Sequence, residues 1–254
     1  ILNLIERLAC RVADLVVTVH EPYREELVRR SVPADKTLVV MNTVDEALLP
    51  AQPLPPAREP FRVVYHGTIT PHYGVGLLVE ALPELTAKLP DVRLEIYGEG
   101  DAVPELRAAA ESAGVADRLE LSGVALPHDE VLRRVAGASV GAITNLPTSL
   151  NRFALSTKLF EYVVLGIPVV VAGLPTLQAH FDESEAAFFR AGDAESLAAA
   201  LVHVAEDYDA ALARARAARA RYDGAYRWAL QADGYVSALK ALGGRTDTAS
   251  HRER

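Results

Sequence analysis

From residue 61 onward, the chain alternates between two hydrophobic patterns. Short runs of consecutive apolar, often β-branched residues predict buried strands over residues 61–66, 92–97, 119–122, 139–144, 169–171 and 186–190. Between them, apolar residues recur at helical spacing over residues 74–89, 102–113, 128–136, 174–181 and 194–205. Strands separated by helices of this length predict an α/β fold with a doubly wound parallel sheet flanked by helices. Such sheets bind ligands at the carboxyl ends of their strands.

The rest of the chain has a different organisation. Residues 1–48 have the pattern helix, strand, helix, strand, and residues 49–60 contain five prolines without a hydrophobic period, which predicts a linker. We therefore expect a main domain over residues 61–224. An amphipathic helix is predicted over residues 225–242, and the polar residues 243–254 are predicted to be a disordered tail.

Composition and charge exclude several classes of protein. The net charge of −8 argues against non-specific nucleic-acid binding as the main role. The single cysteine, Cys10, rules out an internal disulfide and fits a reducing compartment. The sequence contains no run of about 18 uncharged apolar residues, so it predicts no membrane-spanning helix. Because the sequence lacks an initiator methionine and opens on a helical pattern, we expect it to be part of a longer protein.

The stretch Ser156–Gly173 combines a short helix, a Gly-Ile-Pro turn and a buried strand. Gly166 suits a left-handed helix end, and Pro168 prevents the helix from continuing. Lys158 and Glu161 are three residues apart and share a face of this helix. Two interpretations follow from spacing alone: a phosphate site at a helix N-terminus beside parallel strands, or an ordinary surface ion pair on an α/β helix.

Glycines follow three of the predicted strands, namely Gly67, Gly98 with Gly100, and Gly123. A glycine after a strand is commonly a simple turn, but several at one edge of a sheet favour a close backbone approach to a ligand. The sequence contains neither G-x-G-x-x-G nor G-x-x-x-x-G-K-[ST], which disfavours an ordinary NAD enzyme and a P-loop NTPase.

Together, these segments resemble a known family. Thr157–Tyr162, followed by Gly166–Val170, is similar to the donor-site segment of retaining glycosyltransferases of family 4, which have the GT-B fold. Tyr65–Ile69 resembles the glycine-rich loop after the first strand of their nucleotide domain. Ile96–Gly100 and Leu121–Val124 resemble the next two strand ends. The resemblance extends over about residues 14–242, and the order of the segments makes it specific.

The resemblance implies two Rossmann-like domains with the active site in the cleft between them. The second domain binds a nucleotide diphosphate sugar and the first binds the acceptor. Residues 1–48 match the last elements of the acceptor domain, whose remainder we expect to be missing, and Trp228 and Tyr235 lie on the helix that crosses back to it. Retaining transfer is implied to proceed by front-face attack of an acceptor hydroxyl while the diphosphate leaves.

The resemblance also assigns the candidate donor-binding residues. A leaving diphosphate needs cations and aligned N–H donors, for which the candidates are Lys158 and the helix start at Ser156 and Thr157. Glu161 matches the glutamate that binds the ribose hydroxyls. Three further candidates remain. Gly67 would let its loop approach the diphosphate closely, and Thr68 could donate its hydroxyl. Glu99 either faces the nucleotide or is simply solvated.

The sequence departs from the family pattern at three positions. Phe153 stands where the family often has an acid that contacts the sugar, and Thr68 and Tyr73 stand where it commonly has Arg and Lys. His72 and Arg152 are candidates to replace those cations, although His66 and His72 are both interpreted more readily as turn or core histidines. These departures put sugar selectivity and, to a lesser degree, activity in question.

The expected function is retaining, metal-independent transfer of a sugar from a nucleotide diphosphate sugar to a hydroxyl of a glycan, lipid or small molecule. The resemblance implies no metal or other cofactor, since such sites stabilise the leaving group with side chains and helix dipoles. The alternatives are a non-catalytic GT-B-like binding module and a GT-B nucleotide-sugar epimerase. We expect a cytoplasmic protein, with peripheral membrane contact possible through the missing domain. The residues specify no particular base, sugar or acceptor.

Overall fold

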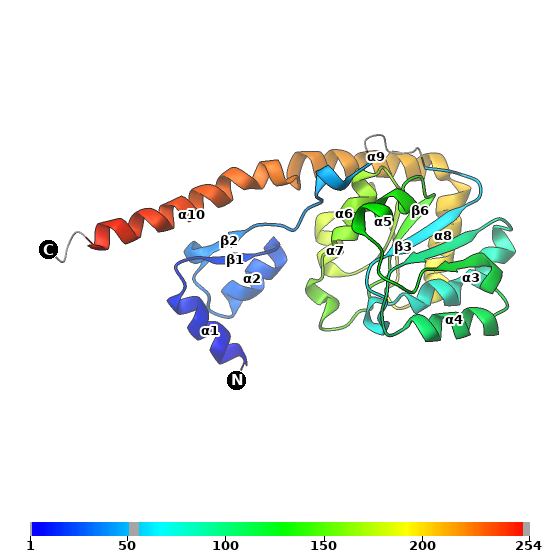
Figure 1. The fold of residues 1–254 in the computed structure, drawn as a ribbon, viewed down its shortest axis with the longest axis horizontal. Coiled ribbons are helices and arrows are strands. Elements are labelled where there is room, and N and C mark those ends of the chain that lie inside the picture. The colour runs from blue at the N-terminus through cyan, green and yellow to red at the C-terminus, as the bar shows by residue number, and fades with distance from the viewer. Residues whose placement is uncertain (1, 51–55, 251–254) are drawn as a thin grey trace. The chain divides into compact units, whose positions relative to one another are not determined.

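The computed structural model describes residues 2–50 and 56–250 (Figure 1). Their contacts divide them into two compact units. One comprises the described residues up to Thr43 together with those from Asp223 onward, and the other runs from Val44 to Tyr222. The division at Thr43 lies ahead of the proline-rich stretch 49–60, whose composition predicts the linker. Residues 51–55 of that stretch lie outside the described residues.

The larger unit contains a six-stranded sheet in which every neighbouring pair is parallel. The spatial order is β5-β4-β3-β6-β7-β8. The bounds are β3 Arg62–His66, β4 Arg93–Tyr97, β5 Leu119–Leu121, β6 Val140–Ile143, β7 Val169–Ala172 and β8 Ala187–Phe189. The order reverses beside β3, so the sheet is doubly wound as predicted, and β3 lies at the switch point where ligands bind in such sheets.

Helices cover both faces of this sheet. They are α3 Gly76–Lys88, α4 Val103–Ser112, α5 His128–Val135, α6 Thr157–Val164, α7 Pro175–His180, α8 Ala194–Glu206 and α9 Tyr208–Ala225. Right-handed crossovers require the helices after β3 and β4 to lie opposite those after β5, β6 and β7. In Figure 1, α3, α4 and α8 accordingly lie on one side of β3, and α5, α6 and α7 lie on the other. Short 3₁₀ turns occur at Ala34–Lys36, Glu46–Leu48, Pro71–Tyr73, Ala116–Arg118 and Asn151–Phe153.

The core explains the position of α6. All four residues of β7 are buried, as expected for a β-branched strand covered on both faces. Tyr162 of α6 is fully buried, and its hydroxyl donates to the carbonyl of Val64 in β3 at 3.3 Å. Its ring fills the space above Gly141 of β6, where a Cβ would overlap the ring atoms. The helix that carries Lys158 and Glu161 is therefore fixed over the two central strands.

The described residues on either side of positions 51–55 pack onto the larger unit. Val44 is 5% exposed, and the 3₁₀ turn Glu46–Leu48 contacts α5. Beyond the gap, the amide of Ala57 donates to the carbonyl of Gly137 at 3.0 Å, and the carbonyl of Ala57 accepts from the hydroxyl of Ser139 at 2.6 Å. These two hydrogen bonds hold the backbone of Ala57 against the start of β6.

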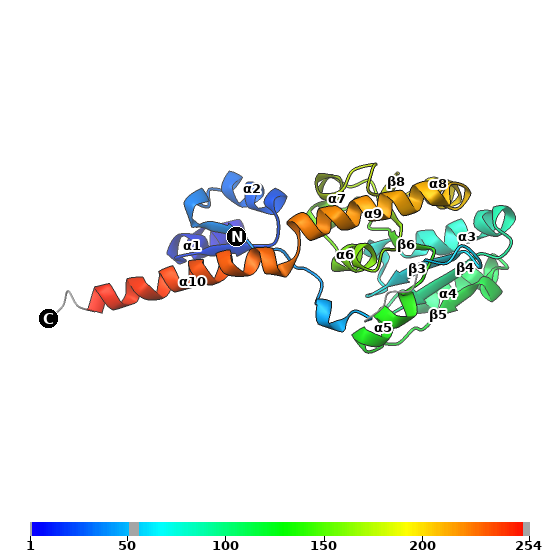
Figure 2. The same ribbon diagram turned by 90° about the horizontal axis from the view of Figure 1, so that it is seen from above.

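The smaller unit contains α1 Leu2–Val12, β1 Val16–Thr18, α2 Glu21–Arg29, β2 Thr37–Val39 and α10 Trp228–Ser250. Strands β1 and β2 are parallel, and the amide of Met41 donates to Oε1 of Gln231 in α10 at 2.6 Å. Helix α10, shown in orange and red in Figure 2, continues to Ser250, so the prediction that a disordered tail begins after Leu242 is wrong for residues 243–250. Residues 251–254 of that tail lie outside the described residues.

Among the residues that the structure describes, none of the helices combines the length and the apolar character that crossing a bilayer requires.

Candidate functional site

The ends of β3 and β4 meet in a close backbone approach. The amide of Gly67 donates to the carbonyl of Tyr97 at 2.9 Å, and the amide of Ile69 donates to that of Glu99 at 2.8 Å. A Cβ at Gly98 would fall on the carbonyl oxygen of Gly67. Gly67 itself has a φ of +107°, which is strained for other residues. The glycines therefore allow the backbones at these two strand ends to pack closely. Gly67 is exposed at the carboxyl end of β3.

Lys158 reaches from α6 to this junction. Its Nζ donates to the hydroxyl of Tyr65 at 2.9 Å and lies 4.1 Å from the centre of that ring and 5.4 Å from the ring of Tyr73. A Cβ at Gly67 would be 3.4 Å from the same Nζ. Although Lys158 keeps some accessible surface, burial among these groups lowers its pKa to about 8, and the charge of Glu161 opposes the shift. The cation is thus held beside the exposed backbone of Gly67.

Glu161, one turn further along α6, is only 6% exposed. Its Oε2 lies 3.1 Å from Nε2 of His66 and its Oε1 lies 3.2 Å from Nε2 of His128. Burial by itself raises the pKa of this carboxyl, but His66, His128 and Lys158 outweigh burial and lower it. The residue is therefore an ionised, enclosed carboxylate.

His66 is buried between this carboxylate and the ring of Tyr162, whose centre is 5.1 Å away. Burial lowers the pKa of His66, while Glu161 raises it and Lys158 and His128 lower it further. Its Nε2 is within ion-pairing distance of Glu161, but the contact does not have the angle of a regular hydrogen bond. The two side chains are therefore in contact without a regular hydrogen bond.

A pocket of about 240 Å³ opens beside these groups, at the carboxyl ends of β3 and β4. It is lined by His66, Gly67, Thr68, Tyr97, Gly98, Glu99, Ala125, Leu126, His128 and Val131. Two pockets of similar size occur elsewhere. One lies near Phe61 and Tyr208 and the other near Gly74 and Leu106, and neither is lined by Gly67, which adjoins Lys158, or by His128, which adjoins Glu161.

The predicted site residues fall into two groups. Gly67 and Lys158 come together, with Glu161 one helical turn away and the carbonyl of Thr68 accepting from Tyr65 at 2.9 Å. Glu99 is exposed at the rim of the pocket. Ser156 and Thr157 begin α6, and the side chain of Ser156 makes no capping hydrogen bond. The alternative of a surface ion pair between Lys158 and Glu161 is wrong for Glu161, because its carboxylate is buried between two histidines.

The residues considered as replacement cations have other neighbours. The His72 ring contacts the hydroxyl of Thr70 at 3.0 Å, and the guanidinium of Arg152 lies 5.0 Å from the centre of the Phe153 ring. Tyr73 presents its ring to Lys158. The position at which a cation is common in the family is thus occupied by an aromatic face that attracts the lysine.

Three residues of the site were not among the predicted site residues. Tyr65 and His66 precede Gly67 on β3, and His128 is the first residue of α5. The signal for the first two is their position immediately before the strand-end glycine. His128 follows Pro127 at a predicted helix start, which resembles an ordinary helix boundary, so no local pattern indicates that it lies beside Glu161.

No group of three or more His, Cys, Asp or Glu side chains in the described part of the chain has an arrangement that could hold a metal ion. One Asp-x-Asp sequence occurs, Asp207-Tyr208-Asp209, at the junction of α8 and α9. There the carboxylate of Asp207 accepts from the amide of Ala210 at 3.2 Å, and Asp209 pairs with Arg58. These acids therefore have structural partners at the start of α9.

The parallel sheet with its switch point at β3, and the helix α6 that carries Lys158 and Glu161, define the class of protein. Its fold is that of the C-terminal domain of GT-B glycosyltransferases. The chain belongs to the family described as Glycosyl transferases group 1, whose model matches residues 60–207.

Several known proteins are similar to this chain. Glycogen synthase of Mycobacterium tuberculosis is 28% identical over 226 residues, which cover 88% of this chain and 53% of that protein. Phosphatidyl-myo-inositol mannosyltransferase of Mycolicibacterium smegmatis is 29% identical over 203 residues, which cover 73% of this chain and 50% of that protein. The chain thus spans about half of the length of these two relatives.

A solved structure of HepE from Anabaena, in complex with UDP and glucose, has the same fold. It superposes with a TM-score of 0.79 at 20% identity and covers 94% of this chain and 66% of that one. Sucrose-phosphate synthase from Thermosynechococcus elongatus superposes with a TM-score of 0.75 at 20% identity, covering 96% and 62%.

Proposed function

We propose that this chain binds a nucleotide diphosphate sugar and forms the donor half of a retaining glycosyltransferase. The observation that carries the proposal is the placement of the Lys158 ammonium beside Gly67, with the ionised carboxylate of Glu161 one turn away. A nucleoside diphosphate presents the complementary chemistry, because its phosphates need a cation and backbone N–H groups while its ribose offers two hydroxyl donors.

Each candidate residue has a role in this proposal. Lys158 neutralises the diphosphate, and the exposed backbone at Gly67 and Thr68 allows the phosphates to approach closely. Ser156 and Thr157, at the start of α6, present the positive end of the helix dipole. Glu161 accepts from the ribose hydroxyls, and Glu99 faces the nucleoside from the pocket rim.

In the proposed reaction an oxygen of the acceptor bonds to the anomeric carbon on the face that the diphosphate leaves. The bond between that carbon and the diphosphate oxygen breaks, and the acceptor proton passes to the departing diphosphate. The configuration at the anomeric carbon is thereby retained. Lys158 stabilises the charge that develops on the leaving group, so the reaction as proposed uses no metal. The acceptor is a hydroxyl of a glycan, a lipid or a small molecule.

Family membership and the name of the mannosyltransferase relative support the proposed transfer, and the UDP and glucose in the HepE complex support a nucleotide-sugar donor. We assign the reaction to the cytoplasm, where nucleotide sugars and reduced thiols such as that of Cys10 occur, with peripheral membrane contact where the acceptor is a lipid.

Isothermal calorimetry with UDP, GDP, ADP and dTDP tests donor binding. Glu161→Ala and Lys158→Ala should each weaken the preferred nucleotide by about tenfold or more, since each removes a charged hydrogen-bonding partner. Glu84→Ala and Lys88→Ala alter exposed residues of the same type on α3 and should leave the affinity unchanged. Absence of binding to every nucleotide would refute the proposal.

Two alternatives remain distinct from transfer. A non-catalytic binding module is suggested by Phe153, Thr68 and Tyr73, which depart from the family pattern. Transfer of sugar from any member of a nucleotide-sugar panel would exclude it, and NMR of the product would report whether the anomeric configuration is retained. An epimerase would instead interconvert the free nucleotide sugar without an acceptor.

A further inference from the structure

The two carboxylate oxygens of Glu161 have different surroundings. Oε2 faces His66, whose side chain is 6% exposed, whereas Oε1 faces His128, whose side chain is 48% exposed. A ligand therefore reaches this carboxylate most readily from the side on which His128 lies. The same histidine also lines the pocket of about 240 Å³, so one imidazole both contacts the carboxylate and forms a wall of the adjacent cavity.

Helix α5, which begins at His128, is held firmly against the sheet. Its residues Val131, Leu132 and Val135 are buried. At its other end, the carbonyl of Arg134 accepts from Nη2 of Arg62 at 2.9 Å. His128 therefore projects from a fixed helix toward Glu161.

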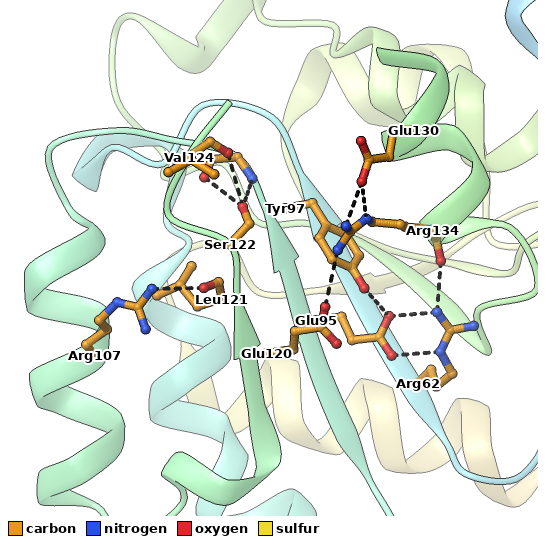
Figure 3. A network of polar contacts seen from close by, with 11 residues as sticks. Arg62, Glu95, Tyr97, Arg107, Glu120, Leu121, Ser122, Val124, Glu130 and Arg134 are labelled. Atoms are coloured by element: carbon orange, nitrogen blue, oxygen red, sulfur yellow. Dashed lines mark hydrogen bonds and ion pairs between the residues drawn. The ribbon is translucent and has the colours of Figure 1, made fainter. Parts of the chain in front are cut away.

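Figure 3 shows a network of polar contacts that joins β3 and β4 to α5. Arg62 donates to both oxygens of Glu95 at 2.7 Å, and the hydroxyl of Tyr97 donates to Oε2 of Glu95 at 3.0 Å. The guanidinium of Arg134 lies over the ring of Tyr97, 5.5 Å from its centre. Because Tyr97 is also a wall of the pocket, the network connects the pocket, the sheet and α5.

We infer that His128 is a positioning residue for nucleoside recognition, a role that rests on the proposed function. Its Nε2–H holds Oε1 of Glu161 so that the remaining lone pairs of the carboxylate face the hydroxyls of a ribose. A carboxylate has about four acceptor positions, and a hydrogen bond from His128 uses only one of them. Without His128 the carboxylate would rotate more freely, and orienting it would cost affinity on binding.

This role makes a specific prediction about the sugar of the nucleoside. The contribution of His128 should appear only when the ligand has ribose hydroxyls for Glu161 to accept. The test uses the base that the chain binds best among UDP, GDP, ADP and dTDP. We compare two diphosphates of that base, one with ribose and one with 2′,3′-dideoxyribose. His128→Leu keeps the bulk of the side chain without an N–H, His128→Gln keeps an N–H donor, and His203→Ala changes an exposed histidine on α8.

By calorimetry, His128→Leu should bind the ribonucleotide about tenfold more weakly and the dideoxynucleotide as the unaltered chain does. His128→Gln should recover most of the ribonucleotide affinity, and His203→Ala should change neither value. An equal loss for both ligands, or no loss, would overturn the inference while nucleotide binding by the unaltered chain upholds the proposed function. If the unaltered chain binds no nucleotide, both fall. If His128→Leu does not fold, His128→Gln alone tests the inference. The inference is overturned if His128→Gln binds the ribonucleotide as weakly as Glu161→Ala does.

Discussion

The hydroxyl of Tyr65 joins Lys158 to the loop that follows β3. It accepts a hydrogen bond from the lysine ammonium at 2.9 Å and donates one to the carbonyl of Thr68 at 2.9 Å. Tyr65 is 1% exposed, so its hydroxyl makes both hydrogen bonds away from water. One buried oxygen thus sets the direction of the cation and the course of the loop beside it.

Removing this oxygen should weaken nucleotide binding. Tyr65→Phe keeps the ring beneath the ammonium but leaves Lys158 without its acceptor, so we expect about three- to tenfold lower affinity and a loss of about 1–2 kcal/mol in the free energy of unfolding. Tyr208→Phe is the matched control, because its buried hydroxyl donates to the carbonyl of Ser139 at 3.0 Å, away from Lys158. It should lose similar stability without losing affinity. Unchanged affinity in Tyr65→Phe would contradict this role.

The affinity for a nucleoside diphosphate should fall above pH 8. Burial lowers the pKa of Lys158 to about 8 in the free protein, and only the protonated form attracts the diphosphate. As pH rises past 8, binding must take up a proton, and the apparent affinity should fall by up to about tenfold per pH unit. Calorimetry between pH 7 and 9.5 measures this, and Lys158→Arg should show a flatter profile because arginine stays charged. Parallel profiles for the two proteins would assign the titration to another group.

The same lysine should make stability increase with pH. Its folded-state pKa of about 8 lies below the ordinary lysine value of 10.5, so between these values the unfolded chain holds the proton that the folded chain has released. The free energy of unfolding therefore rises with pH through this window. Denaturant titrations at pH 7 and 9.5 should show a gain for the unaltered chain relative to Lys158→Met, which has no titrating group at this position. If the difference in unfolding free energy between the two proteins is the same at both pH values, the lowered pKa of Lys158 is contradicted.

The space above Gly141 gives a prediction for the core. Gly141→Ala would place a methyl group into the ring of Tyr162, which is fully buried and has no room to retreat. We expect a loss of about 1–3 kcal/mol in the free energy of unfolding, measured by urea denaturation. Gly224→Ala is the control, since Gly224 lies in α9 with no atom within 4 Å of its Cβ position. There alanine should stabilise the helix by up to about 1 kcal/mol.

The network in Figure 3 combines buried and exposed ion pairs, which should differ in strength. Glu95 is 7% exposed and receives two hydrogen bonds from Arg62, so Glu95→Ala should cost about 2–4 kcal/mol by leaving a partly buried guanidinium unpaired. Glu130 pairs with Arg134 at the surface of α5, and Glu130→Ala should cost less than about 1 kcal/mol. Thermal or urea unfolding of the two variants measures the contrast. Equal losses would show that burial does not set the strength of these pairs.

Much of the larger unit could be predicted from hydrophobic pattern, because β6 and β7 are fully buried and β3 and β4 are buried except for their first residue. The run that forms β7 and the glycine that ends β3 are local signals, and each fixes an element without reference to the rest of the chain. The spacing of Lys158 and Glu161 likewise placed both on α6, and the resemblance then gave them roles.

The surroundings of Glu161 could not be predicted in the same way. Its neighbours His66 and His128 come from β3 and α5, and their proximity depends on the reversal of strand order at β3, which sequence spacing does not report. The boundary at Thr43 also depends on tertiary contacts. Val44 is buried and Ala57 is hydrogen-bonded in the larger unit, and a proline-rich composition does not indicate such contacts. At the other end of the chain, α10 continues through polar residues that lack the periodicity used to predict helices.

The central place of β3 has a consequence for how the protein can change. Tyr65, His66 and Gly67 all come from this strand or its end, and two strands on one side and three on the other separate it from the margins of the sheet. Substitutions in the marginal strands β5 and β8 should alter stability while leaving the contacts that we propose for the end of β3 in place. The sensitivity of the proposed nucleotide binding to substitution should therefore decrease from β3 toward β5 and β8.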